Sequence, residues 1–219
     1  MARVSRDAYA EAFRRVTGRP LVKLPQVAGA NDSEIFFESL ALNTPGDTRP
    51  EGLVLLTHYV RALAIAFGAR QDLLAEQGRV LPGARDALAA VSRQPGVIQT
   101  VLTGSIRENA YAKLRAFSLD GFLDLEIGGF GSDVYPKGAA IVRSLVATAE
   151  KYAITLSPAD SAYLADSVRD VAAAKVGGVR SVGIGSGRST LSELRDAGAD
   201  PVLTDLTDTA RVVAAIMRA

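Results

Sequence analysis

The second part of the chain, from about residue 81 to its end, alternates β-rich runs with helical patterns, and this alternation constrains the fold most. Strands are predicted at 97–102, 125–127, 161–164, 181–184 and 201–203. Strands that alternate with helices are typical of a parallel sheet covered by helices on both faces. We therefore expect an α/β fold with a doubly wound, Rossmann-like core. The helices between and after these strands are predicted at 106–117, 138–152, 168–176 and 207–217.

The first eighty residues have a different pattern, without strand alternation. An apolar stripe from Tyr9 to Val16 predicts one helix, residues 33–42 a second, and residues 53–67 a long apolar third. We expect an α-helical subdomain over residues 1–80 and the α/β core over residues 81–219, and Leu81-Pro82-Gly83 marks the change.

Composition excludes several classes of function. The 219 residues have a formal net charge of +1 and no basic run with interleaved aromatic residues, so we expect no nucleic-acid partner. No apolar stretch approaches the length of a membrane span, and the amino terminus does not resemble a signal peptide. The absence of cysteine excludes disulfides and thiolate chemistry. A cytoplasmic protein without a membrane partner is expected.

Polar residues follow successive predicted strands at the sheet edge where open α/β proteins bind ligands. Thr103-Gly104-Ser105 closes the run 97–102, Lys137 opens a helix after Pro136, and Asp166 with Asp170 follows the run 161–164. Each feature also has a simple structural interpretation: a turn with a helix cap, a solvated lysine, and carboxylates that favour a helix N-terminus.

Together these residues favour the chemistry of phosphoryl groups. A hydroxyl and a glycine ahead of a helix suit a phosphate oxygen at Thr103, Gly104 and Ser105. Lys137 can offset phosphate charge, and two carboxylates suit Mg²⁺, which takes one or two carboxylates besides water and substrate phosphate. Positioning and electrostatics supply most of the catalysis of phosphoryl transfer.

At these residues the chain resembles the haloacid dehalogenase superfamily, in its phosphoglycolate-phosphatase-like branch with a helical cap. Thr103 matches the second motif of the family, Lys137 the third, and Asp166 with Asp170 the fourth. The resemblance implies that Thr103 binds phosphate, that Lys137 orients nucleophile and phosphate, and that the two aspartates serve Mg²⁺. The loop that reaches over the substrate from the cap is matched by Gly29, Asn31 and Asp32.

The chain departs from the family where the nucleophile is expected. The family begins with a strand ending in Asp-x-Asp, and no two aspartates of this chain are spaced in that way. Ala30, Ala165 and Ser167 also replace residues that are common in the family. Because the first core strand is missing, its two neighbours should lose hydrogen-bond partners. Three explanations are open: the natural product starts upstream of Met1, which we favour, the remaining strands close up, or a partner supplies a strand. An unfilled sheet edge would favour a homo-oligomer.

Three hypotheses follow. The first is a Mg²⁺-dependent phosphomonoester hydrolase of small phosphorylated metabolites, whose nucleophile segment is absent from the 219 residues. The second is a non-catalytic pseudoenzyme that binds a phosphorylated ligand or a protein partner. The third is a nucleotide-binding loop at Gly183 to Gly187, a weak match to a dinucleotide motif. The only histidine, His58, is interpreted as structural because it lies within an apolar helix.

Overall fold

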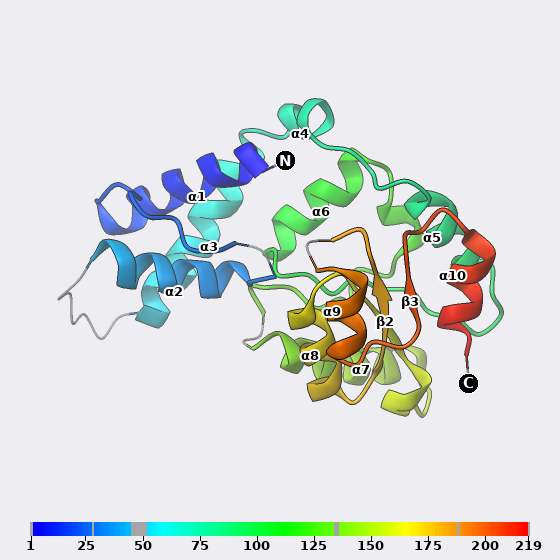
Figure 1. Ribbon diagram of the computed structural model, residues 1–219. Helices are drawn as coiled ribbons and strands as arrows, with labels where there is room; N and C mark the ends of the chain where they lie inside the picture. The colour runs from blue at the N-terminus through cyan, green and yellow to red at the C-terminus, as the bar shows by residue number, and fades with distance from the viewer. Residues whose placement is uncertain (1, 28, 45–51, 134–135, 188, 219) are drawn as a thin grey trace. The chain divides into compact units, whose positions relative to one another are not determined.

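The computed structural model describes residues 2–27, 29–44, 52–133, 136–187 and 189–218 (Figure 1). The chain divides into two compact units. The first unit comprises Met1–Arg79, Thr103–Ser118 and Phe130–Tyr135. The second unit comprises Val80–Leu102, Leu119–Gly129 and Pro136–Ala219. The segment Thr103–Ser118 therefore groups with the N-terminal helices, although the sequence pattern assigns it to the core.

The first unit contains helices and loops and no strand in its described residues, as the sequence predicts for the N-terminal part. Its core is built around aromatic side chains, and the rings of Phe36 and Tyr59 stack with 4.4 Å between centroids. Phe13, Leu63 and Ile106 belong to the same fully buried cluster. The helices are α1 (Ala2–Thr17), α2 (Asp32–Asn43), α3 (Gly52–Gly68), α4 (Asp72–Gln77) and α6 (Arg107–Ala116).

The second unit contains a parallel sheet of β1 (Ala162–Ala165), β2 (Arg180–Ile184) and β3 (Val202–Leu203), in that order. Leu164 pairs with Val182 in the register of β1 and β2, and Gly183 pairs with Val202 in that of β2 and β3. The helices are α5 (Ala84–Ser92), α7 (Lys137–Tyr152), α8 (Val168–Gly177), α9 (Leu191–Asp196) and α10 (Thr209–Ile216), with short 3-10 turns at Asp120–Phe122 and Pro158–Asp160.

Helices cover both faces of this sheet. Val182 and Ile184 of β2 pack with residues of α5 and α10, whereas Ala165 of β1 packs with Val171 of α8 and Leu194 of α9. Figure 1 shows α8 and α9 on one side of β2, and α5 and α10 on the other. Because side chains alternate along a strand, one strand can bury both faces in this way. The α/β doubly wound core expected from the sequence is confirmed.

Two predicted strands are wrong. Residues 125–127 form no strand, and the segment 97–102 contributes only an isolated parallel bridge between Leu102 and Gly129. On that side the carbonyl of Gln99 accepts from the N–H of Asp124 at 2.8 Å. A regular strand needs a continuous row of backbone hydrogen bonds to a neighbouring strand. Within the described chain no strand pairs with the second edge of the segment 97–102. The segment is consequently half-buried along its whole length.

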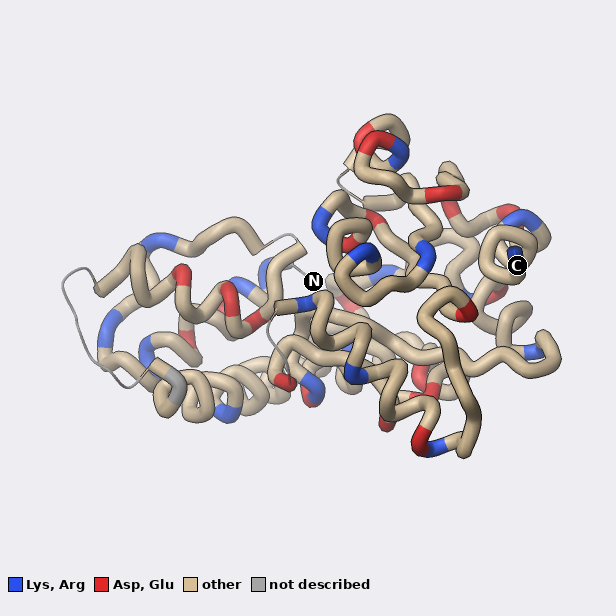
Figure 2. Tube along the Cα trace, turned by 90° about the horizontal axis from the view of Figure 1, so that it is seen from below, with Lys and Arg blue, Asp and Glu red and all other residues tan. Residues whose placement is uncertain are grey.

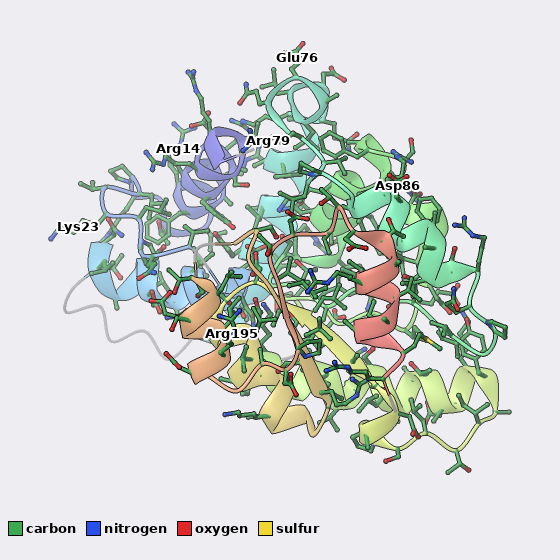
Figure 3. All side chains as sticks on the ribbon, turned by 45° about the vertical axis from the view of Figure 1, so that its right-hand side comes forward. Arg14, Lys23, Glu76, Arg79, Asp86 and Arg195 are labelled. Atoms are coloured by element: carbon green, nitrogen blue, oxygen red, sulfur yellow. The ribbon has the colours of Figure 1, made fainter. Side chains whose placement is uncertain are left out.

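Charged side chains lie mainly at the surface of both units. Lys and Arg are interspersed with Asp and Glu along the tube (Figure 2). The exposed Arg14 on α1 and Glu76 on α4 extend away from the ribbon (Figure 3). No helix in the described ranges is both long and apolar enough to cross a membrane. The charged groups that are buried are therefore the ones that need an explanation.

Candidate functional site

The two aspartates singled out by the sequence lie where β1 meets α8. Asp166 follows the last residue of β1, and Asp170 lies in the first turn of α8. Ser167 caps the helix: its hydroxyl accepts from the backbone N–H of Asp170 at 3.3 Å and donates to Asp170 Oδ2 at 2.8 Å. A serine N-cap satisfies a helix donor that would otherwise lack a partner. The turn therefore fixes both carboxylates at the carboxyl end of the strand.

Lys137 joins this pair from the start of α7. Its ammonium donates to Asp170 Oδ1 at 2.5 Å, and the Tyr163 hydroxyl donates to the same oxygen at 3.1 Å. Asp170 is only 4% exposed, whereas Asp166 is exposed. A buried carboxylate is tolerated only when it is paired and hydrogen-bonded, and Asp170 meets both conditions. Lys137, which is 33 positions from Asp170 in sequence, is thus brought to the two aspartates within the second unit.

The two carboxyls have different proton affinities. Burial raises the pKa of Asp166 to about 6, and the hydrogen bond to Asp170 and that residue's charge add to the rise. Burial acts in the same direction on Asp170, but the charge and hydrogen bond of Lys137 outweigh it and lower the pKa of Asp170. A second negative charge beside Asp170 is thus disfavoured. A cation at Asp166 would remove this penalty.

The donor set fits a hard divalent cation. Ionised carboxylates offer only acceptor oxygens, and Asp166 presents them at the surface of the unit. The described residues contain no group of three or more histidine, cysteine, aspartate or glutamate side chains that could hold a metal. Two carboxylates still suit Mg²⁺, because this ion usually keeps several waters and shares its remaining ligands with substrate phosphates.

The glycine-rich loop after β2 packs against the same turn. A Cβ atom at Gly187 would lie 2.2 Å from the carbonyl oxygen of Asp166, so a larger residue would displace the aspartate. A Cβ at Gly185 would lie 2.8 Å from the carbonyl oxygen of Thr204. Close packing of backbone therefore accounts for these glycines without a bound nucleotide. Arg188 lies outside the described residues.

The predicted phosphate loop, Thr103-Gly104-Ser105, belongs to the first unit and is held by backbone contacts. The backbone N–H of Ser105 donates to Thr103 Oγ1 at 3.2 Å, and the Ser105 carbonyl accepts from Gly131 at 2.9 Å. A Cβ at Gly104 would lie 2.3 Å from the carbonyl oxygen of Ala30. The loop thus requires glycine at this position, in keeping with its tight approach to the Ala30 backbone.

The predicted substrate loop of the cap, Gly29, Asn31 and Asp32, meets the phosphate loop directly. The backbone N–H of Asp32 donates to the Gly104 carbonyl at 2.7 Å. Asn31 and Asp32 are 1% and 3% exposed. Asn31 is the N-cap residue of α2, and its N–H donates to Glu34 Oε2 at 2.7 Å. Both side chains are therefore directed into the unit in this structure. A role for Gly29, Asn31 and Asp32 in contacting substrate stays a prediction.

Three residues of these clusters were not anticipated from the sequence. Tyr163 and Ser167 bond to Asp170, and Lys113 on α6 donates to the Ser105 hydroxyl at 2.8 Å. Ser167 follows a predicted strand and directly precedes an alanine-rich helical pattern. A serine at this place signals a helix N-cap. Nothing in the local pattern around Tyr163 or Lys113 points to a polar partner.

Comparison with known proteins identifies the family. The family model for haloacid dehalogenase-like hydrolases matches residues 4–175, most of the chain. The chain belongs to this family. The match covers the N-terminal helices and the first part of the α/β core. The roles of Thr103, Lys137, Asp166 and Asp170 stay predictions. No curated protein matches the chain.

Solved structures of similar fold cover nearly the whole chain. A hydrolase from Pseudomonas syringae is 20% identical with a TM-score of 0.62, covering 95% of this chain and 90% of its own. CbbY from Rhodobacter sphaeroides, solved in complex with xylulose-(1,5)bisphosphate, is 21% identical with a TM-score of 0.63, covering 94% and 89%. A predicted phosphoglycolate phosphatase from Haemophilus somnus is 18% identical with a TM-score of 0.58, covering 96% and 92%. At these identities the likeness supports the dehalogenase-like fold.

Proposed function

We propose that this dehalogenase-like chain carries the phosphate-binding and cation-binding residues of a Mg²⁺-dependent hydrolase that acts on phosphomonoesters of small metabolites. The observation that carries the proposal is the cluster of Asp166, Asp170 and Lys137 at the carboxyl end of β1. An ammonium at 2.5 Å from a buried carboxylate, beside a second and exposed carboxylate, combines an anion-binding group with a cation site. Phosphate ester hydrolysis needs both.

The residues take distinct roles in this proposal. Asp166 would hold the cation, which supplies charge neutralisation at phosphate oxygens when it is bound. Asp170 keeps Lys137 in one position through the bond at 2.5 Å, and Tyr163 and Ser167 fix Asp170 itself. Lys137 would orient the anionic groups. In the first unit, the hydroxyls of Thr103 and Ser105 and the backbone N–H of Gly104 would donate hydrogen bonds to phosphate oxygens.

The proposal assigns the nucleophile to a strand beside β1. Among the described strands, β1 pairs only with β2, and no described strand pairs with its other edge. Leu164 in the middle of β1 is 37% exposed, unlike a residue in a covered central strand. An apolar strand ending in Asp-x-Asp would cover this edge and bring a carboxylate to the end of β1 where Asp166 follows.

A phosphatase assay tests the proposal. We would measure release of the aryl alcohol from a generic aryl phosphate with Mg²⁺, using the 219-residue chain and the product of any longer in-frame reading frame. The expected result is turnover by the product that includes an Asp-x-Asp strand, and its loss in Asp166→Asn. Asp200→Asn, which alters an exposed carboxylate elsewhere in the second unit, serves as the control. Turnover that survives in Asp166→Asn would contradict the proposal.

The pseudoenzyme is the second candidate, and the absence of any Asp-x-Asp spacing in the 219 residues favours it. In that case the chain binds a phosphorylated ligand without hydrolysing it. The same assay separates the two functions: a chain that binds inorganic phosphate and Mg²⁺ but gives no turnover in either form supports the pseudoenzyme. Turnover above the rate of the Asp166→Asn variant excludes it.

A further inference from the structure

A buried polar cluster lies beneath the phosphate loop, within the first unit. Asp32 is at its centre: its Oδ1 accepts from the Tyr9 hydroxyl at 2.6 Å, and its Oδ2 accepts from the backbone N–H of Ile106 at 2.8 Å. Burial raises the pKa of Asp32 and lowers the pKa of Lys113. The attraction between the two opposite charges opposes both shifts. A buried charge carries a desolvation cost that pairing and hydrogen bonds offset, and the bonds from Tyr9 and Ile106 fix the Asp32 carboxylate in one position.

Asp32 fixes the backbone of the phosphate loop at two points. Its own N–H donates to the Gly104 carbonyl at 2.7 Å, and its carboxylate accepts from Ile106, the residue just before α6. The two bonds bracket Ser105. Because they join residues more than seventy positions apart, the loop conformation depends on the segment around Asp32 and not only on its own sequence.

Lys113 fixes the Ser105 side chain. Its ammonium donates to Ser105 Oγ at 2.8 Å, and it also lies 5.2 Å from the centre of the Phe67 ring. A hydroxyl has one proton to donate, and an ammonium can only donate. Ser105 must therefore accept from Lys113, and its own proton is directed elsewhere. Within the described part of the chain no acceptor receives this proton.

We propose that Lys113 and Asp32 are positioning residues for an anion at the 103–105 loop: Asp32 holds the loop backbone, and Lys113 turns the Ser105 hydroxyl into a dedicated donor. This inference rests on the proposed phosphate-binding function and deepens it. The anion would receive the Ser105 proton in addition to the bonds from Thr103 and the loop backbone. Neither Lys113 nor Asp32 needs to touch the anion, since both act through other groups.

The test is the affinity of the 219-residue chain for inorganic phosphate in the presence of Mg²⁺, measured by titration calorimetry. Lys113→Met and Ser105→Ala should each weaken phosphate binding by about tenfold, the size of one hydrogen bond. The double variant should be no weaker than either single variant, because both remove the same interaction. Lys113→Arg, which keeps a cationic donor, should restore binding to within about threefold of the unaltered chain.

A matched control separates this role from a general loss of stability. Lys151→Met makes the same substitution at an ion-paired lysine of the second unit, where Lys151 bonds to Asp124 and Glu126. Its phosphate affinity should equal that of the unaltered chain. Unchanged affinity in Lys113→Met, or additive losses in the double variant, would overturn the inference.

Amide hydrogen exchange over residues 103–107 without ligand gives a second readout that is independent of phosphate binding. Exchange should become faster in Asp32→Asn and Lys113→Met and stay unchanged in Lys151→Met. If the unaltered chain does not bind phosphate while exchange responds in this way, the proposed function fails and the positioning role stands. If exchange is insensitive to both substitutions, the positioning role fails whatever the affinity for phosphate.

Discussion

The two aspartates after β1 are alike in sequence and different in their surroundings. Asp166 is exposed, with a pKa raised to about 6 by burial of part of the carboxyl and by its neighbour Asp170. Asp170 is buried and paired with Lys137. The resemblance implies that both serve one metal ion, and this stays a prediction. What the structure adds is that one carboxylate is exposed and the other is buried in an ion pair.

At the residue scale, the ion pair of Asp170 and Lys137 gives the first prediction. Both side chains are largely buried, with 6% and 15% of their area exposed. Asp170→Asn removes the charge of the carboxylate that is paired with the ammonium, and breaking a buried pair in this way should lower the free energy of unfolding by about 3 kcal/mol. Urea denaturation of the variant and the unaltered chain measures the difference.

An exposed ion pair in the same unit provides the control. Arg218 lies 4.0 Å from Asp200, and the two side chains are 63% and 89% exposed. Arg218→Met should change the free energy of unfolding by less than about 1 kcal/mol, as is usual for surface pairs. Equal losses in Asp170→Asn and Arg218→Met would mean that the buried pair contributes no more than a surface one.

At the scale of elements, the sequence correctly predicts the strands that find a pairing strand within the described chain. The strand at 161–164 is confirmed as β1 and that at 181–184 as β2, because each has a parallel neighbour and helices on its faces. The run 97–102 has the same β-rich composition and fails to form a strand. Composition reports which residues suit a pleated surface, but it cannot report whether a neighbouring strand is available.

Short helices are harder to predict than long ones. The six residues of α9 offer too few positions for an apolar period, so only their cap identifies them. Thr190 and Glu193 form this cap: Thr190 Oγ1 accepts from the Glu193 N–H at 3.2 Å, and Glu193 Oε2 accepts from the Thr190 N–H at 2.7 Å. This reciprocal pattern is a capping box, and it can be recognised in the sequence.

The second prediction concerns the pH dependence of this cap. The hydrogen bond from the Thr190 backbone lowers the pKa of Glu193 in the folded chain. A carboxyl with a lowered pKa stabilises the folded state above its unfolded pKa, near 4.3, and this contribution is lost as the pH falls through the folded pKa. Glu193→Gln should therefore flatten the loss of stability on the acid side, as measured by thermal unfolding from pH 7 down to about pH 3.

Glu150→Gln is the matched control, since Glu150 is an exposed carboxylate on α7 whose side chain has no hydrogen-bond partner among the described residues. Its acid profile should coincide with that of the unaltered chain. If Glu193→Gln and Glu150→Gln give the same profile, the capping box of α9 does not contribute to the pH dependence.

At the scale of the whole molecule, the candidate site depends on contacts between residues that are distant in sequence, and the sequence predicts only some of them. Lys137 and Asp170 are 33 positions apart, and Asp32 and the Ile106 amide are 74 apart. The order of motifs in a strand–helix alternation predicts that Lys137 and Asp170 lie at one sheet edge, because carboxyl ends of parallel strands share an edge. It does not predict their ion pair. No such rule links Asp32 or Lys113 to the 103–105 loop, so their contacts with it appear only in the folded chain.

The third prediction uses the unfolding equilibrium of the whole chain as a reporter of the cation site. A ligand that binds only the folded state stabilises it in proportion to the logarithm of its concentration, by about 2.7 kcal/mol at one hundred times its dissociation constant. Mg²⁺ should therefore raise the unfolding temperature at pH 7, and a chelator should reverse the effect. In Asp166→Asn the rise should disappear, because the exposed carboxylate is the group that would hold the ion.

Asp200→Asn separates specific binding from a general effect of salt. Asp200 is an exposed carboxylate of the same unit, so a non-specific effect of Mg²⁺ would be as large in Asp166→Asn as in Asp200→Asn. Specific binding requires that Asp200→Asn keeps the full rise while Asp166→Asn loses it. A rise of equal size in both variants would remove Asp166 from the cation site, and with it the main support for a Mg²⁺-dependent hydrolase.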